Sequence, residues 1–248
     1  MSGVGYISEG IPGRVHYQIS SIKDLEILFV LLDEFPLLTR KMKNYRLFKE
    51  AWRMISNKEH LIEEGLIKIV SLKAAFNNSG LSEKLQEEFP NLVLLAEICT
   101  PEEQDIERSI YDPSWLAGFA DGEGCFFVQL RKAAGYKVGY QVSMKFQITQ
   151  DILDKKLLQN IVEYLGCGYY REVAKNSDGR FEVESAKEIL AKIIPFFDKY
   201  PLLGTKAKDC VDFKQVALLI EKKAHLTPEG LEQISKIKAG MNRARGKD

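Results

Sequence analysis

The sequence has few of the residues from which zinc sites and disulfide frameworks are built. Its 248 residues include only three histidines and four cysteines, which are Cys99, Cys125, Cys167 and Cys210. No two cysteines have the short spacing of a zinc-ligand pair, so we expect reduced thiols. This composition argues against a metal site made of histidine and cysteine.

Long apolar runs are also missing. No stretch reaches the length that crosses a bilayer, and we therefore expect no membrane partner. The N-terminus shows neither a signal peptide nor an Arg/Ser-rich transit segment. Such a sequence is typical of a protein that is made in the compartment where it works.

The chain has no excess charge of either sign, because 35 Lys and Arg residues balance 35 Asp and Glu residues. Taken alone, a net charge of zero argues against a nucleic-acid-binding protein. Net charge ignores distribution, however, and a basic face can be balanced by acidic segments elsewhere. The segment from Ser82 to Arg108 holds eight acidic residues and only two basic ones. It can offset a basic surface on another part of the molecule.

An internal duplication is the clearest feature that is present. Phe29 to Asn77 aligns with Ile194 to Asn242 at a constant offset of 165 without a gap, and 19 of these 49 positions are identical. The identities include the Pro-Leu-Leu sequences at 36–38 and 201–203, and the lysines Lys41 and Lys206 that follow them. Repeats of this length indicate two copies of one structural unit.

Residues 113–122 are predicted to form a helix. Asp112 is a good N-cap, and Pro113 suits the first helical position because its missing N–H would be unpaired there anyway. Gly118 and Gly122 are four residues apart and share one face, which lets another helix backbone approach closely. Glu123 follows at the frayed C-terminal end, just before an apolar strand. The pattern therefore sets a carboxylate at the bottom of a predicted close helix pair.

Residues Leu116 to Gly124 resemble, position by position, the motif of the LAGLIDADG homing endonucleases. The resemblance implies an α+β fold made of α-β-β-α-β-β-α repeats, in which antiparallel, saddle-shaped sheets are backed by helices. The second copy fits this order, with helices at 113–122, 152–165, 187–199, 207–222 and 227–240 and strands at 125–132, 138–149, 167–174 and 179–184. In the first copy we expect a strand at 14–19 and helices at 23–34, 47–56 and 63–75.

The duplication also predicts the domain organisation. Residues 1–77 form a first repeat that is incomplete, because subtracting 165 from Trp115 gives position −50, so the first copy lacks its own motif helix. Residues 78–111 form a linker, and residues 112–248 form a complete second repeat. The missing helix would have to come from a second polypeptide, an upstream exon or a partner copy of the same chain.

One predicted strand has a clean polar face. Between Tyr140 and Gln150, apolar residues alternate with polar ones, which is typical of a half-solvated strand. With the motif helix beside it, we expect this face to enter the major groove of double-stranded DNA, where polar side chains meet base edges and phosphates. The predicted DNA-binding residues are Gln129, Arg131, Lys132, Lys137, Gln141, Ser143, Lys145, Gln147, Arg171, Lys175 and Arg180.

Phosphodiester hydrolysis needs a hard divalent cation, and Mg²⁺ is the expected cofactor. Glu123 is the oxygen ligand that the sequence favours. The resemblance adds the backbone carbonyl of Gly122 as a second ligand and makes Asp121 a structural residue of the helix interface. It also places Lys206 and Lys41 beside the scissile phosphates, and it gives Gln150 a role in ordering solvent near the metal.

The resemblance thus implies a site-specific double-strand DNA endonuclease, encoded in an intron of a mitochondrion by analogy with the family. Two alternatives stay open. The same scaffold serves intron RNA maturases and non-cutting DNA-binding proteins, and having one motif carboxylate in place of two favours them. The third reading is an unrelated sheet-and-helix protein without a nucleic-acid role.

Overall fold

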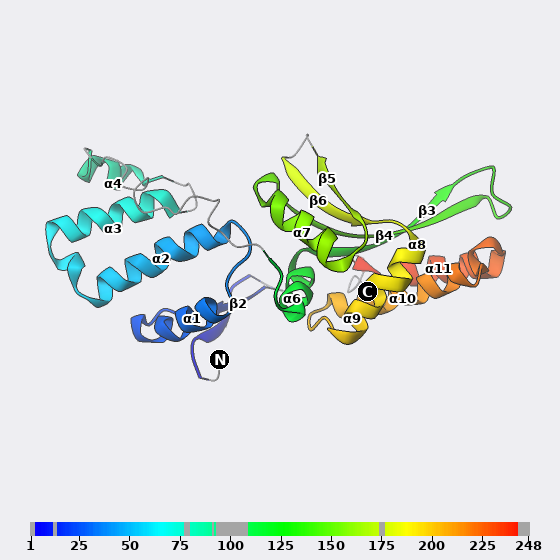
Figure 1. Cartoon of the computed structure of the whole chain (residues 1–248), viewed down its shortest axis with the longest axis horizontal. Coiled ribbons are helices and arrows are strands. Elements are labelled where there is room, and N and C mark those ends of the chain that lie inside the picture. The colour runs from blue at the N-terminus through cyan, green and yellow to red at the C-terminus, as the bar shows by residue number, and fades with distance from the viewer. Residues whose placement is uncertain are drawn as a thin grey trace. The chain divides into compact units, whose positions relative to one another are not determined.

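The computed structural model describes residues 3–11, 14–76, 80–90, 92, 109–173 and 177–242. The chain forms two compact units, Met1–Glu107 and Arg108–Asp248, which are drawn with their secondary-structure labels in Figure 1. Within the described residues, no helix combines the length and the apolar composition that crossing a bilayer requires.

The second unit is built on a four-stranded antiparallel sheet with the strand order β3-β4-β6-β5. The strands are β3 (Gly124–Lys132), β4 (Tyr140–Asp151), β5 (Tyr169–Val173) and β6 (Asp178–Val183). The helix α6 (Pro113–Glu123) runs directly into β3, and α7 (Lys155–Leu165) connects β4 to β5 after a short 3₁₀ turn at Ile152–Asp154. Figure 1 shows β3 and β4 as the longest strands, extending together as a hairpin.

Four more helical segments complete this unit. They are α8 (Ala186–Glu188), α9 (Ile194–Lys199), α10 (Lys206–Glu221) and α11 (Pro228–Ala239). A π-helical stretch at Ile189–Ile193 joins α8 to α9. Pro195 follows at the start of α9, and a wider turn ahead of a proline accommodates a backbone that lacks one hydrogen-bond donor.

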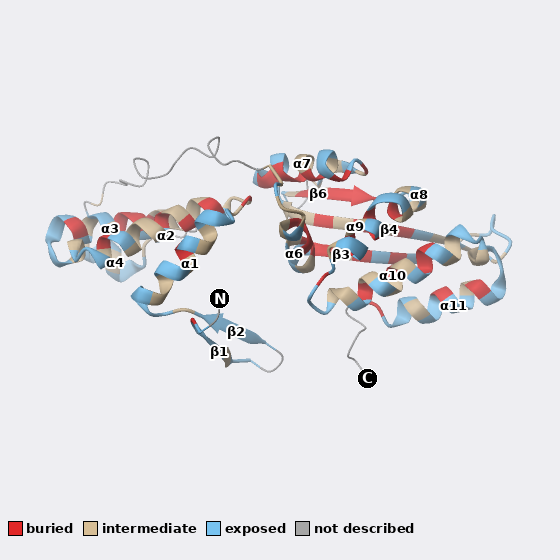
Figure 2. Ribbon diagram, turned by 60° about the horizontal axis from the view of Figure 1, so that its bottom comes forward, coloured by how far each residue is buried: buried red, intermediate tan, exposed pale blue. Residues whose placement is uncertain are grey.

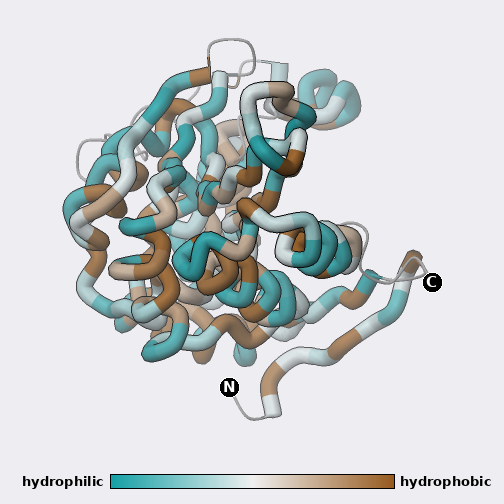
Figure 3. Tube along the Cα trace, turned by 90° about the vertical axis from the view of Figure 1, so that its right-hand side faces the viewer, coloured by the Kyte–Doolittle hydropathy of each residue, from teal (hydrophilic) through white to brown (hydrophobic). Residues whose placement is uncertain are grey.

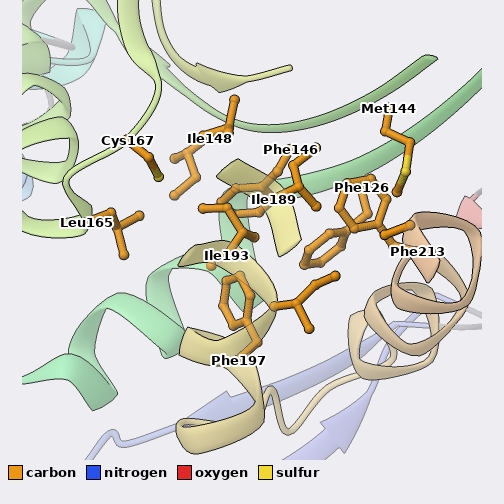
Figure 4. Packing of buried hydrophobic residues seen from close by; sticks show 14 of the residues in the cluster. Phe126, Met144, Phe146, Ile148, Leu165, Cys167, Ile189, Ile193, Phe197 and Phe213 are labelled. Carbon is orange, nitrogen blue, oxygen red and sulfur yellow. The ribbon is translucent and has the colours of Figure 1, made fainter. Parts of the chain in front are cut away.

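The core of the second unit lies between the sheet and these helices. Phe126 and Phe146 stack with a ring-centroid separation of 4.9 Å, and Phe197 and Phe213 pack on them from the helical layer. Figure 4 shows these rings converging with the aliphatic side chains around them. Phe126, Phe146 and Phe213 are almost completely buried. Because β4 alternates strictly, burying its apolar face against this core turns its polar face outward.

The first unit contains a two-stranded sheet and four helices among its described residues. The elements are β1 (Tyr6–Glu9), β2 (Val15–Gln18), α1 (Ile22–Glu34), α2 (Lys41–Ser56), α3 (Glu63–Ala75) and α4 (Glu83–Glu88), with a 3₁₀ turn at Glu59–Leu61. Phe29 packs against Tyr45 and Trp52 to form a small core. The unit therefore has its own apolar centre, smaller than that of the second unit.

The hairpin β1–β2 is exposed over most of its length, as its pale blue colour in Figure 2 shows. Hydrophobic side chains lie among the exposed ones, including Ile7, Val15 and Tyr17. In Figure 3, brown hydrophobic segments alternate with paler and teal ones along the chain near the N-terminus.

The duplication found in the sequence is present in the structure at the same offset. Adding 165 to the bounds of α2 gives Lys206–Glu221, the bounds of α10, and the 3₁₀ turn Glu59–Leu61 corresponds to Ala224–Leu226. The ion pair between Lys49 and Asp33 recurs between Lys214 and Asp198. Gly65 and Gly230 serve the same purpose, since a Cβ on either would lie 1.9 or 2.0 Å from the carbonyl oxygen of Glu59 or Ala224.

The α+β class and the predicted order of elements are confirmed, with small shifts in the bounds. The main error concerns α2, which begins at Lys41 and not at Leu47 as expected. The predicted linker at 78–111 falls largely on residues outside those described, and its described part includes the short helix α4.

Candidate functional site

The motif helix α6 positions the candidate acid at the end of a well-anchored element. The Asp112 carboxylate caps the helix by accepting a hydrogen bond of 2.7 Å from the Ser114 N–H. Leu116, Ala117 and Ala120 are buried on one side. Glu123 is the last residue of the helix and is exposed, directly before the first residue of β3. The fold therefore presents this carboxylate at the junction of helix and sheet.

Asp121 fixes the end of α6 to a loop that is distant in the sequence. One oxygen of its carboxylate accepts hydrogen bonds from the backbone N–H groups of Leu203 and Gly204, at 2.9 and 2.6 Å. A Cβ at Gly204 would lie 2.7 Å from an Asp121 carboxylate oxygen, so a larger residue would have to displace this carboxylate. The described residues thus bond Asp121 to this loop, and its expected role at an interface between two motif helices stays a prediction.

The loop held by Asp121 leads directly to Lys206, the first residue of α10. Its ammonium group donates a hydrogen bond of 2.6 Å to the backbone carbonyl of Gly122. The structure thus brings together Lys206, Gly122 and the adjacent Glu123, which the sequence placed in one site. An ammonium group at this position supplies positive charge beside an exposed carboxylate.

A second set of hydrogen bonds, made by Asn242, connects α10 to β3. The Asn242 backbone N–H donates to the buried Asp209 carboxylate, one turn along α10 from Lys206, at 2.9 Å. The Asn242 side-chain amide donates to the Phe126 carbonyl of β3 at 3.0 Å. Asn242 thereby ties the start of α10 to the start of β3. Sequence reasoning missed this role, for which the recurrence of the asparagine at position 77 of the first repeat was the only signal.

Cys125 of β3 also contacts Asn242. Its thiol donates a weak hydrogen bond to the Asn242 side-chain oxygen at 3.4 Å. Burial raises the pKa of the Cys125 thiol despite the nearby positive charge of Lys206. Burial therefore favours the protonated thiol, which is the less reactive form.

The oxygen ligands at the end of α6 are of the type that a hard divalent cation prefers, but they are too few to enclose one. Glu123 and the Gly122 carbonyl are both oxygen ligands, as Mg²⁺ and Ca²⁺ prefer. The described residues contain no cluster of three or more His, Cys, Asp or Glu side chains that could enclose a metal ion. A cation here would need further oxygens from water and from a phosphate, which is the usual arrangement for Mg²⁺ at phosphodiesters.

The two remaining catalytic candidates are placed less directly. Gln150 lies near the end of β4, two residues beyond Ile148, which pairs with Gly124 next to Glu123. By alternation, Gln150 has the parity of the core-facing residues, and no described hydrogen bond joins it to Glu123. Lys41 is the exposed first residue of α2 in the first unit, the position that Lys206 holds in α10. Their proposed roles stay predictions.

The polar face of the sheet is continuous across its strands. The strand register pairs Gln129 with Ser143 and Arg131 with Gln141, and it places Arg180 opposite both Thr149 and Arg171. A groove of about 570 Å³ runs along the β3–β4 hairpin, with polar residues of this face in its lining. These residues are Gln129, Arg131, Gln141, Ser143 and Lys145. Most of the predicted DNA-binding set therefore shares one surface.

Three predicted DNA-binding lysines lie on the opposite side of a strand, in a turn or outside the described residues. Lys132 pairs with Tyr140 and has the parity of Val128 and Leu130, so it lies on the opposite side of the strand. Lys137 belongs to the turn that joins β3 to β4. Placing Lys132 on the polar face was wrong, because side chains alternate in a strand. DNA binding by Lys132 and Lys137 stays a prediction. Lys175 lies outside the described residues.

Sequence reasoning missed Glu182, which lies on the polar face in β6 and is fully buried. Its carboxylate accepts hydrogen bonds from Lys145 at 3.2 Å and from Arg171 at 3.0 Å. Two of the predicted DNA-binding cations are thus ion-paired. An acidic residue in a polar strand carries no sequence signal of such burial.

The glycine face of α6 is open. A Cβ built on Gly118 or on Gly122 would meet no described atom within 4 Å. The close helix pair predicted from this spacing is therefore not formed by the described residues. An exposed face of small residues on the helix that carries the candidate acid is the feature that remains.

Comparison with known proteins identifies this combination of motif helix and antiparallel sheet. The family model described as "LAGLIDADG endonuclease" matches residues 116–217. The crystal structure of the I-SmaMI LAGLIDADG homing endonuclease bound to cleaved DNA superposes with a TM-score of 0.91 at 40% identity, covering 98% of this chain and 79% of that one. This chain belongs to the LAGLIDADG endonuclease family. The resemblance seen in residues 116–124 is thereby confirmed, and an unrelated sheet-and-helix protein is excluded.

One further solved structure and two curated proteins are also similar to this chain. The I-LtrWI homing endonuclease bound to target DNA has a TM-score of 0.89 at 39% identity, covering 97% of this chain and 79% of that one. "Probable intron-encoded endonuclease 3" of Neurospora crassa is 37% identical over 224 residues, or 89% of this chain and 40% of that protein. "Probable intron-encoded endonuclease 2" of the same fungus is 32% identical, over 96% of this chain and 52% of that protein.

This LAGLIDADG chain therefore spans only about 40–52% of the length of these two curated relatives. It corresponds to a larger part of the homing endonucleases of known structure, about four-fifths of each.

Proposed function

We propose that the protein is a site-specific DNA endonuclease of the homing type, which hydrolyses phosphodiester bonds with a divalent metal ion. The observation that carries the proposal is the convergence of Glu123, Gly122 and Lys206 at one end of a polar sheet face. The relatives named as intron-encoded endonucleases, and the similar structures bound to DNA, support the same function.

Each group has a distinct role in this proposal. Glu123 and the Gly122 carbonyl would hold the cation, with Mg²⁺ as the favoured ion; a structure of I-SmaMI with calcium ions supports a divalent site in the family. The bound ion would supply activation of water and charge stabilisation. Lys206 places its positive charge where charge develops on the phosphate. Gln150 and Lys41 are the weaker candidates for ordering solvent and for an equivalent second position.

The polar sheet face is the proposed DNA-reading surface. It displays amide, hydroxyl and guanidinium groups, which are the types that meet base edges in the major groove. We further propose the repeat organisation 1–77, 78–111 and 112–248, with a second motif helix docking on the open Gly118–Gly122 face. Relatives from a fungal ND4 intron and a cox1 intron support an origin in a mitochondrion.

Incubating the chain with a randomised duplex library and Mg²⁺, followed by sequencing of new DNA ends, tests the function. We expect cuts or single-strand nicks at a recurrent sequence. These should disappear in Glu123→Gln and persist in Glu163→Gln, a matched change at an exposed glutamate of α7.

The alternatives predict other results. Sequence-selective binding without cutting, unaffected by Glu123→Gln, would indicate a non-cutting DNA-binding protein. Intron-splicing assistance that survives the same substitution would indicate a maturase. Neither cutting nor selective binding would overturn the proposed function.

A further inference from the structure

The centre of the polar sheet face contains a carboxylate that no nucleic acid could reach. Glu182 has 0% of its side chain exposed. By register it lies in β6 between Gln147 of β4 and Tyr169 of β5. One of its oxygens accepts hydrogen bonds from Lys145 and Arg171, and the other accepts one from the Tyr169 hydroxyl at 3.4 Å. The carboxylate therefore joins side chains from both neighbouring strands.

A buried negative charge is unexpected on a face that would meet a polyanion. Burying a carboxylate is costly unless it is paired and hydrogen-bonded, and even then such a cluster adds little net stability. Because Glu182 is inaccessible, it can accept no bond from a base. Its effect must act through the residues that it holds.

The two basic side chains that are paired with Glu182 stay partly exposed to solvent. The side chains of Lys145 and Arg171 are 25% and 50% exposed. A lysine has three donors and an arginine five, so each keeps donors beyond those bonded to Glu182. Lys145 is also restrained by the ring of Phe127, whose centroid is 5.5 Å from Nζ. The cluster thus consists of two cations held in fixed positions with half of their combined charge neutralised.

Hydrogen-bond donors held in fixed positions and a reduced positive charge both favour discrimination between DNA sequences. Attraction of free lysines and arginines to phosphates is independent of sequence and dominates non-specific binding. Base edges are distinguished by donors held at defined positions. Lys145 lines the same groove as Gln129 and Ser143, so it is placed among the side chains best suited to base contacts.

We propose that Glu182 is a specificity-determining positioning residue, which holds Lys145 and Arg171 in place for base recognition and withholds them from indiscriminate phosphate binding. This inference rests on the proposed function and adds to it the origin of the discrimination between DNA sequences.

The test is Glu182→Gln, which keeps the shape of the side chain and removes its charge. Dissociation constants are measured at several salt concentrations for the duplex recovered from the library and for a random duplex of equal length. We expect tighter binding of the random duplex, with a slope of log K against log salt that is steeper by about one phosphate contact. The affinity ratio between target and random duplex should fall by about tenfold or more.

Glu172→Gln is the matched control. Glu172 pairs with Lys155 of α7 and neighbours Arg171 in β5, but by alternation it lies on the opposite side of the sheet. The substitution changes the net charge equally and releases a lysine away from the proposed DNA face. It should leave the affinity ratio unchanged.

If Glu182→Gln does not fold, Lys145→Gln replaces it. This variant should lose discrimination without gaining affinity for the random duplex. Equal effects of the Glu182 and Glu172 substitutions, or an unchanged ratio in Lys145→Gln, would overturn the inference and leave the DNA function intact. Failure of the unsubstituted chain to bind any duplex selectively would overturn both.

Discussion

The contact of Lys206 with the candidate metal site is direct, since its ammonium group lies 2.6 Å from the Gly122 carbonyl oxygen. Replacing it with methionine keeps the aliphatic stem and removes the charge. We expect cleavage at saturating DNA to slow by about 100- to 1,000-fold, the usual loss when one charge-stabilising donor is removed. Single-turnover kinetics measure this rate.

Lys208→Met is the control, since Lys208 is exposed in the same helix. An equal rate loss in both variants would indicate a general weakening of DNA binding and would contradict a specific role for Lys206.

The contact between Asp121 and Gly204 gives a second prediction at this scale. Gly204→Ala should destabilise the protein by about 1–3 kcal/mol, because its new methyl group meets the carboxylate and disturbs two hydrogen bonds. In an Asp121→Ala background, the same substitution should cost much less, since the clash is gone. Denaturant unfolding of the four proteins measures this coupling, and strictly additive losses would argue against the geometry.

At the scale of elements, Asn242 connects α10 to β3 and adopts a left-handed backbone conformation, with φ of 56°. Asn242→Gly keeps this conformation accessible but loses the side-chain bonds, which should cost about 1 kcal/mol. Asn242→Ala should cost about 1–2 kcal/mol more, because a Cβ disfavours this region. Thermal or denaturant unfolding separates the two; an alanine variant as stable as the glycine variant would exclude a backbone contribution.

The elements also show how far the sequence leads. Strict alternation predicted β4 and its polar face, because burial of one face imposes a period of two. The first turns of α2 were missed, since the run from Lys41 to Arg46 is largely polar and only Met42 and Tyr45 reach the core. Their partner Phe29 comes from α1, so tertiary packing decides the start of this helix.

The site was predictable where one segment carries it and hidden where several meet. The motif pointed to Glu123 and the repeat pointed to Lys206, whereas the role of Asn242 was not predicted. The ion pairs of Glu182 depend on the register of three strands, which no local pattern specifies. Lys132 is a different case, because alternation along β3 alone already places it on the opposite face from Arg131.

For the chain as a whole, we expect the metal ion to be needed for cutting DNA more than for binding it. The polar face is separate from the oxygen ligands at the end of α6, and a cation held partly by phosphate acts on the reaction itself. Adding EDTA should abolish cleavage, and Mg²⁺ should restore it, while gel-shift affinity for the selected duplex should change by less than about tenfold. Cleavage that persists in EDTA would contradict metal dependence.

A crystal structure of the chain with its selected duplex and Mn²⁺ would show whether the end of α6 binds a divalent cation beside DNA, because anomalous scattering locates the metal. We expect an anomalous peak at about 2.0–2.4 Å from a Glu123 oxygen, beside a DNA phosphate. Ordered DNA on the sheet with no metal at Glu123, or with metal only at another position, would show that Glu123 is not the metal ligand.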